Sequence, residues 1–176
     1  MARQNEKVLN LLEQNGRSLY TLMVRLTLSE DTAQDLLQEL FLKLAASDID
    51  AVSNLSAYAY RTAVNLAFDW RRKKTGQKIM LAEMPRSAAD DNFPLNSLIR
   101  KEELEQILNA VESLNGLSRE IFVIHYIQQV SYKNIATAFE KTEDQVRAIC
   151  CKGVEKIRLL LSPNADDFCR KEANDG

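Results

Sequence analysis

Apolar residues recur along this chain with a period near 3.6 residues, and this pattern constrains the fold more than any other feature. The segment from about Asn5 to Leu28 displays it first, with apolar positions at Val8, Leu11, Leu12, Leu19, Leu22, Met23 and Leu26. Runs that alternate apolar and polar residues, as half-buried strands require, are few. The sequence therefore predicts an all-α fold, with a possible break of the first helix near Gly16.

The periodicity lapses between about Thr75 and Pro94, a stretch with two prolines, a glycine and clustered aspartates. A linker explains this better than a long loop inside one domain, because structureless loops of this length are uncommon in compact domains. A chain of 176 residues that is 45% apolar can form one large core or two small ones. We predict two small helical domains joined by a flexible linker: residues 1–75 and 100–161, with the linker at 76–99 and a tail at 162–176.

Composition argues against several functional classes. The chain has three cysteines and one histidine, without the spacing of a disulfide framework or a zinc site. We expect no metal, no cofactor and no catalytic residues, and an enzymatic function has the least support. Neighbouring helical side chains point about 100° apart, so Cys150 is expected in the core and Cys151 at the surface. There is no signal peptide and no run long enough to span a membrane, which predicts a cytoplasmic protein without membrane insertion.

A second helix is expected to start after Ser29, a good N-cap residue, with acids in its first turn. Its apolar face consists of Ala33, Leu36, Leu37, Leu40, Phe41 and Leu44. The opposite face carries Asp35, Gln38, Glu39 and Leu42 at helical spacing. A leucine on a polar face suggests a docking surface, but a single exposed leucine is also ordinary, so both interpretations stay open.

The third helix, from about Asn54 to Thr75, combines aromatic side chains, a mid-helix asparagine and four consecutive cations. Aromatic rings stack on unpaired bases, amides read base edges and cations hold phosphates, so the segment resembles a grip for single-stranded nucleic acid. Helix propensity disfavours Asn65, so its amide is expected to have a specific partner. Val64 and Phe68 are expected to pack on the first helix. The candidate residues are Tyr58, Tyr60, Arg61, Asn65, Arg71, Arg72, Lys73 and Lys74.

After the linker, a fourth helix is marked by Leu104, Ile107, Leu108, Val111 and Leu114. Ser118 is expected to cap a fifth helix, in which His125 is a packed residue. Ser131 then caps a short helix to Phe139, and after a three-residue turn Thr142 and Gln145 form a T-x-x-Q capping box. This pattern predicts a helix-turn-helix whose second helix presents its exposed start to a DNA major groove. The candidate residues are Lys133, Thr142, Gln145, Arg147, Ala148, Cys151 and Lys152, with Asp144 also exposed.

Three segments in this order resemble one family. They are AQDLLQELFLKL, LSAYAYRTAVNLAFDWRRKK and LSREIFVIHYIQQVSYKNIATAFEKTEDQV. Together they are similar to the extracytoplasmic function (ECF) sigma factors of the sigma-70 family, which keep regions 2 and 4 of larger sigma factors. One departure is Glu140, where relatives have a turn-tolerant residue; a left-handed conformation there costs about 1 kcal/mol.

The resemblance implies a function in transcription initiation. Asp35, Gln38, Glu39 and Leu42 would dock on core RNA polymerase, and Asn65 would read an extruded base of the upstream promoter element. Arg61 and Arg71 to Lys74 would hold the DNA backbone, and the helix-turn-helix would read the distal element. An anti-sigma factor is expected as a further partner. The alternative is a stand-alone helix-turn-helix regulator, which has no need of the docking face around Gln38.

Overall fold

The computed structural model describes residues 2–81 and 95–162. Within these ranges the structure contains seven α-helices, one short 3₁₀ helix and no strand, which confirms the all-α prediction. The helices are α1 (Ala2–Thr27), α2 (Glu30–Ala46), η1 (Ile49–Ala51), α3 (Leu55–Leu81), α4 (Leu95–Glu112), α5 (Gly116–Tyr126), α6 (Tyr132–Ala138) and α7 (Glu143–Leu161).

The first domain is built from α1, α2 and α3, which pack against one another. α1 continues through Gly16, so the possible break is not found; the apolar period on both sides of this residue keeps one face of the helix on the core. The Ser29 hydroxyl accepts the Thr32 N–H at 3.3 Å and caps α2 as predicted. Leu40 and Leu44 of α2 are fully buried.

α3 and α4 both extend into the predicted linker. α3 continues to Leu81 rather than ending at about Thr75, and α4 begins at Leu95. The added residues are Gly76 to Leu81; five of these six follow the glycine, they include strong helix formers, and no proline interrupts them. The remaining stretch of the predicted linker, residues 82–94, lies outside the described residues, as does the predicted tail from residue 163 onward.

The second domain contains α4 to α7. α5 begins at Gly116, two residues before the predicted cap Ser118, because Asn115 Oδ1 accepts the Ser118 N–H at 2.8 Å and caps the helix instead. α6 and α7 form the predicted helix-turn-helix, capped by Ser131 and by the complete Thr142–Gln145 capping box. Its core joins α5, α6 and α7 through Ile121, Ile124, Ile135, Ala136, Val146 and Cys150.

The predicted fourth helix is present as α4, but two of the apolar residues that mark it are exposed. Leu108, Val111 and Leu114 are buried, but Leu104 is 47% and Ile107 41% exposed. α4 turns Leu108 and Val111 toward a cluster that is continuous with the core of α1 to α3. Only one narrow face of α4 packs against that cluster, so Leu104 and Ile107, which lie beside this face, remain exposed to solvent.

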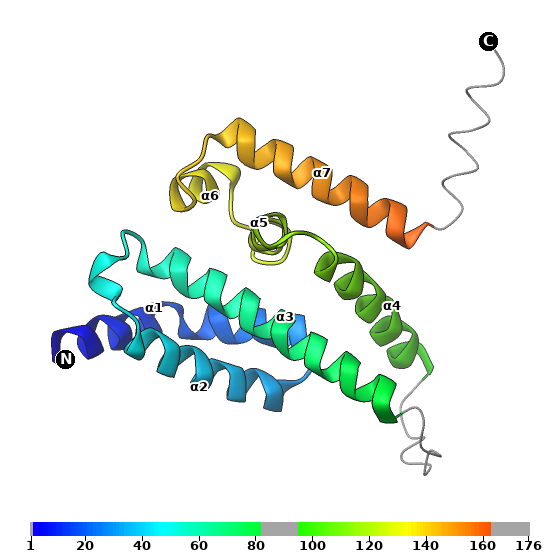
Figure 1. Ribbon diagram of the computed structural model, residues 1–176, viewed down its shortest axis with the longest axis horizontal. Helices are drawn as coiled ribbons and strands as arrows, with labels where there is room; N and C mark the ends of the chain where they lie inside the picture. The colour runs from blue at the N-terminus through cyan, green and yellow to red at the C-terminus, as the bar shows by residue number, and fades with distance from the viewer. Residues whose placement is uncertain (1, 82–94, 163–176) are drawn as a thin grey trace.

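The two domains lie side by side (Figure 1). α3 runs between them, with α5 on one side and α2 on the other. The turn that follows α5 also contacts α1: Arg25 Nη1 donates to the Ile127 carbonyl at 2.7 Å, and Gln128 Nε2 donates to the Ser18 carbonyl at 3.3 Å. The side of α3 that faces away from α2 is therefore covered by the second domain, mainly by α5.

Candidate nucleic-acid interface

The polar face of α2 is open to solvent. Asp35, Gln38, Glu39 and Leu42 are all exposed, and Leu42, at 72%, is the most exposed of the large apolar residues that the structure describes. Glu39 forms an ion pair with Lys43 one turn later, at 3.3 Å. The four predicted polymerase-contact residues therefore share one accessible surface, which we call the α2 face.

Asn65 and Arg61 lie one turn apart on α3 and share a single partner, Glu120 of α5. Asn65 Nδ2 donates to Glu120 Oε1 at 2.8 Å, and Arg61 Nε donates to Glu120 Oε2 at 2.8 Å. Glu120 is only 5% exposed, whereas the Arg61 side chain is 45% exposed. The predicted specific partner of Asn65 therefore exists, and it is a buried carboxylate of the other domain.

Arg119 of α5 binds the oxygen atom of the Asn65 side-chain amide. Its Nη2 donates to Asn65 Oδ1 at 3.3 Å, and its guanidinium lies 5.0 Å from the centre of the Phe68 ring. Burial lowers the pKa of the Arg119 guanidinium below its ordinary value, with the nearby Arg72 cation acting in the same direction. Arg119 Nε is buried without a hydrogen-bond partner among the described residues.

Arg71 does not lie on an open surface, although it was predicted to hold the DNA backbone. It is 5% exposed. Its guanidinium donates to the Leu26 carbonyl at 3.2 Å, to Glu105 Oε2 at 2.8 Å and to Asn109 Oδ1 at 2.9 Å. In this arrangement Arg71 joins α1, α3 and α4, and a phosphate cannot reach it. Its contact with DNA stays a prediction, one that requires α4 to move.

The remaining predicted residues of α3 are more accessible. Arg72 and Lys73 are exposed, and Arg72 pairs with Asp69. The Lys74 ammonium lies 4.8 Å from the centre of the Trp70 ring. Tyr58 is partly buried, with its hydroxyl 3.4 Å from that of Ser47, and Tyr60 packs against the cores of both domains. Val64 and Phe68 are fully buried, as predicted.

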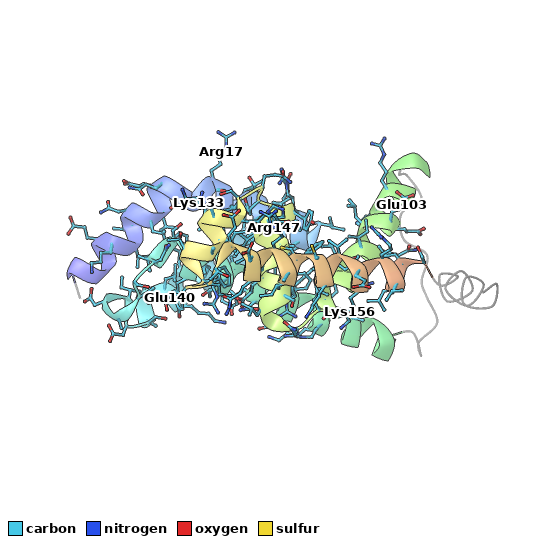
Figure 2. The ribbon with its side chains drawn as sticks, turned by 90° about the horizontal axis from the view of Figure 1, so that it is seen from above. Arg17, Glu103, Lys133, Glu140, Arg147 and Lys156 are labelled. Carbon is cyan, nitrogen blue, oxygen red and sulfur yellow. The ribbon has the colours of Figure 1, made fainter. Side chains whose placement is uncertain are left out.

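The predicted distal-element residues are all exposed, namely Lys133, Thr142, Gln145, Arg147, Ala148, Cys151 and Lys152. Figure 2 shows Lys133 and Arg147 from above. Arg147 pairs with Glu143 at 3.2 Å and lies over the Tyr132 ring. The Gln145 side chain accepts the Thr142 N–H at 3.0 Å, so its amide oxygen serves the cap. Cys151 is exposed and Cys150 buried, as predicted, and burial together with Cys151 raises the pKa of the Cys150 thiol to about 11.

Gly153 on α7 is buried, and its packing role was not predicted from the sequence. A Cβ at this position would lie 3.6 Å from Leu114 and 3.7 Å from Phe122. The side of α7 that carries Gly153 therefore packs on the domain core and leaves the opposite side for a partner. Glu140, between α6 and α7, has a φ of 52°, the left-handed conformation predicted for the turn.

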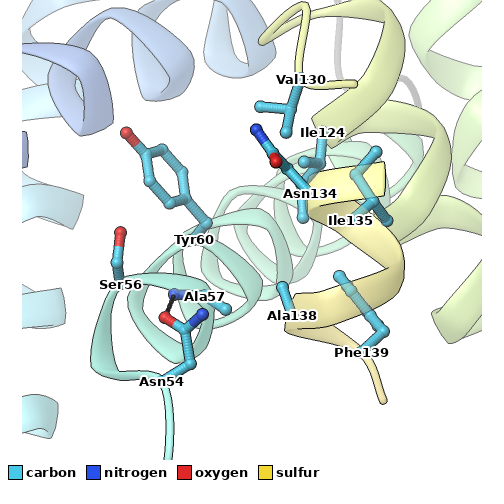
Figure 3. Close-up of a pocket in the computed structure, with 10 residues that line it drawn as sticks. All are labelled: Asn54, Ser56, Ala57, Tyr60, Ile124, Val130, Asn134, Ile135, Ala138 and Phe139. Carbon is cyan, nitrogen blue, oxygen red and sulfur yellow. Dashed lines mark hydrogen bonds between the residues drawn. The ribbon is translucent and has the colours of Figure 1, made fainter. Parts of the chain in front are cut away.

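A pocket of about 190 Å³ lies between α3 and the α5–α6 segment (Figure 3). Its walls are mainly apolar, with Tyr60 and Ala57 on the α3 side and Ile124, Ile135 and Phe139 on the other. Arg61 lies 4.9 Å from the centre of the Phe139 ring, beside this gap. The two domains are thus in direct contact around Glu120, whereas nearer to α6 a pocket separates them.

Sequence reasoning missed Arg119, Glu120, Glu105 and Asn109 as neighbours of the α3 residues. Only the unfavourable position of Asn65 signalled that a partner existed. His125 is packed as predicted, stacked on Tyr132 with its Nδ1 2.9 Å from the Val130 carbonyl oxygen. In the described part of the chain, no group of His, Cys, Asp and Glu side chains could hold a metal ion, and no helix could cross a membrane.

Comparison with known proteins matches both domains. Residues 11–77 match the model of sigma-70 region 2, and residues 104–157 match that of sigma-70 region 4. The ECF RNA polymerase sigma factor SigX of Bacillus subtilis (strain 168) is 22% identical over 167 residues, a match that covers 89% of this chain and 86% of that protein.

One solved structure is similar in fold, and a second aligns with most of the chain. CnrH, solved in complex with the cytosolic domain of CnrY, has 18% identity and a TM-score of 0.51, and the match covers 90% of this chain and 89% of that one. The sigma factor RpoE, solved with the anti-sigma factor NepR from Bartonella quintana, has 19% identity and a TM-score of 0.47 over 92% of this chain and 98% of that one. The two family matches together cover more than half of the sequence, and the chain belongs to the sigma-70 family of sigma factors, in the ECF group.

Proposed function

We propose that this chain is a dissociable initiation factor that directs core RNA polymerase to a specific set of promoters and assists their opening. The observation that carries this function is the presence of both a region 2 match and a region 4 match in one chain. A stand-alone helix-turn-helix regulator needs only the second of these. We therefore favour the sigma factor over that alternative.

The α2 face is the proposed contact with core polymerase. Its four residues project from one side of a helix whose other side is buried, so a partner can cover them without disturbing the core. Leu42 provides apolar surface for such a contact, and the surrounding acids favour a basic partner surface.

α3 and α7 are the proposed DNA contacts. On α3, the Asn65 amide is proposed to read an unpaired base, with Tyr58 and Tyr60 beside it and Arg61 and the cations from residues 71 to 74 on the backbone. On α7, the exposed residues from Gln145 to Lys152 are proposed to face the distal element in duplex form.

The remaining proposals concern catalysis, cofactors, cellular location and regulation. The protein is proposed not to be an enzyme, to need no cofactor and to act in the cytoplasm together with RNA polymerase. An anti-sigma factor is the proposed regulatory partner, by analogy with the family.

The test of the proposed function is Asn65→Ala in the holoenzyme, followed by run-off transcription and permanganate footprinting of a cognate promoter. Loss of a base-edge contact worth about 1 to 3 kcal/mol should weaken promoter opening about fivefold to 150-fold. Binding to core polymerase should not change.

Asn134→Ala is the matched control, because it removes an exposed amide on α6 that has no proposed role. Its opening activity should equal that of the wild type. Unchanged melting in Asn65→Ala would contradict the reading role of α3, and failure of the wild-type chain to bind core polymerase would contradict the function itself.

A further inference from the structure

We infer that Tyr132 and Glu143 are positioning residues for Arg147, and that they hold its guanidinium in the orientation needed to read one guanine in the distal promoter element. The inference rests on the proposed function and deepens it, because it names the base that α7 prefers and the side chains that set this preference. Arg147 is the residue that contacts the base, whereas Tyr132 and Glu143 act only through it.

Arg147 lies in the part of α7 that reads bases in helix-turn-helix proteins. It belongs to the second turn of the helix, five residues after the cap Thr142. The first turns of a recognition helix contact base edges in the major groove. The Arg147 side chain is 58% exposed, so a DNA duplex can reach it.

The Tyr132 ring of α6 is a platform for this guanidinium. Arg147 Cζ lies over the ring at 5.4 Å from its centre, within the range of a cation–π interaction. The ring is itself held by His125, which stacks on it with the ring centres 4.0 Å apart and the planes inclined by 20°. His125 is fixed in turn through Nδ1, which lies 2.9 Å from the Val130 carbonyl oxygen. An arginine that rests on an immobilised ring loses less side-chain freedom when it binds DNA.

Glu143 holds the same guanidinium from α7 itself. Arg147 Nη2 donates to Glu143 Oε1 at 3.2 Å, across one turn of the helix. A ring contact and an ion pair on one side chain together restrict the direction of its N–H groups. Lys133 and Lys152 are also proposed to face the distal element, but among the described residues their side chains form no ion pair or ring contact. Arg147 is therefore suited to a contact of fixed geometry, and the two lysines to phosphates.

The surrounding groups favour a guanine edge over a phosphate as the partner of Arg147. Glu143 and Asp144 place two carboxylates in the first turn of α7, where they would repel a phosphate. The guanine edge is uncharged and presents two acceptors, N7 and O6, which suit two N–H groups of one arginine. Gln145 uses its side-chain oxygen to accept the Thr142 N–H, so its amide offers donors to the groove as well. Adenine and cytosine present a donor there and fit this surface less well.

The test uses the chain reconstituted with core RNA polymerase and a pool of duplex DNA that carries a randomised segment. Bound DNA is sequenced to give the base preference at each position, and binding of the selected DNA is titrated at several salt concentrations. The variants are Arg147→Ala, Tyr132→Leu, Tyr132→Phe and the combination of Tyr132→Leu with Arg147→Ala, each checked for folding by circular dichroism. Tyr20→Leu is the matched control, because it makes the same exchange at a partly buried ring of α1 in the first domain.

The wild type should select guanine at one position of the duplex element. Arg147→Ala should lower that preference about fivefold to 150-fold and leave the other positions unchanged. Tyr132→Leu should lower it about twofold to fivefold at the same position, because the aromatic face is lost. Tyr132→Phe keeps the ring and should select DNA as the wild type does, as should Tyr20→Leu. The double variant should be no less selective than Arg147→Ala alone, because Tyr132 acts through Arg147.

The positioning role is overturned if folded Tyr132→Leu keeps the wild-type preference, or if its effect adds to that of Arg147→Ala. If Tyr132→Leu does not fold, Glu143→Gln decides the question. It keeps the side-chain shape, loses the ion pair and should lower the guanine preference about twofold. An unchanged preference in Glu143→Gln would then overturn the positioning role.

The base-reading role is overturned if Arg147→Ala weakens binding to all sequences equally and flattens the salt dependence, since Arg147 would then hold a phosphate. Selection of a base other than guanine at the Arg147-dependent position also overturns it. A wild-type holoenzyme that selects the upstream element but no base of the duplex element contradicts this inference alone. A holoenzyme that selects no sequence contradicts the proposed function as well.

Discussion

Leu42→Ala separates polymerase docking from folding. The substitution removes three carbon atoms, each worth about 0.8 kcal/mol when buried. Since Leu42 is 72% exposed in the free protein, most of that contribution remains for a partner to gain, and we expect a loss of about 2 kcal/mol in binding to core polymerase. This corresponds to an increase in Kd of about thirtyfold, measurable by titrating labelled protein with core enzyme.

The stability of the variant is the second readout. Leu42 makes little contact with the core, and alanine is a good helix former, so the free energy of unfolding in urea should stay within about 0.5 kcal/mol of the wild type. The matched control is Leu40→Ala on the same helix. Leu40 is fully buried, and its truncation should lower the free energy of unfolding by about 2 to 5 kcal/mol.

Two results would refute this reasoning. If Leu42→Ala destabilises the chain as much as Leu40→Ala does, Leu42 belongs to the core and the α2 face is assigned wrongly. If Leu42→Ala folds normally and binds core polymerase with unchanged affinity, the α2 face is not the docking surface.

Three further predictions test other parts of the molecule. Glu140→Gly should raise the free energy of unfolding by about 0.5 to 1 kcal/mol: glycine relieves the strain of positive φ, and its greater freedom in the unfolded chain offsets part of that gain. At the exposed helical position Glu155 a change to glycine should lower the free energy of unfolding by about 1 kcal/mol. If urea titrations show effects of equal sign at the two positions, the turn geometry at Glu140 is wrong. Iodoacetamide at about pH 8 should alkylate Cys151 and spare Cys150, since the buried thiol, with its pKa of about 11, stays protonated at any pH well below that value; equal labelling of both native residues by peptide mass spectrometry would argue against this packing. The free chain should bind duplex promoter DNA weakly and with a shallow salt slope, because α6 and α7 offer few cations for phosphates; nanomolar, sequence-specific anisotropy binding at physiological salt would favour the stand-alone regulator.

Much of the helical framework could be predicted because the relevant information is local. Ser29 and Thr142 cap the helices that follow them, and each lies within three residues of the N–H that it accepts. The same locality explains the error at Ser118. Asn115 and Ser118 are both suitable caps, and only the structure decides that Asn115 accepts and Ser118 donates.

The contact between the domains could not be predicted, because it depends on residues far apart in the sequence. Asn65 and Glu120 are separated by 55 positions, and several other acids were equally plausible partners. The exposure of Leu104 and Ile107 could not be predicted for the same reason, since packing against the other domain decides which side of α4 is buried. The exposure of the candidate residues on α2 and α7 was predictable because each exposed face follows from the period of one helix.

Three of the buried residues of α3 are small: Ala59, Ala63 and Ala67 lie one turn apart and are all fully buried. Substitutions to larger residues on that side would disturb the core, so the freedom of this helix to evolve is confined to its other side. There Asn65 serves as proposed base reader and also as an anchor for α5. A substitution of Asn65 that changed the preferred promoter base would therefore also remove hydrogen bonds that join α3 to α5, so selection on promoter preference and selection on the domain contact would act on the same side chain.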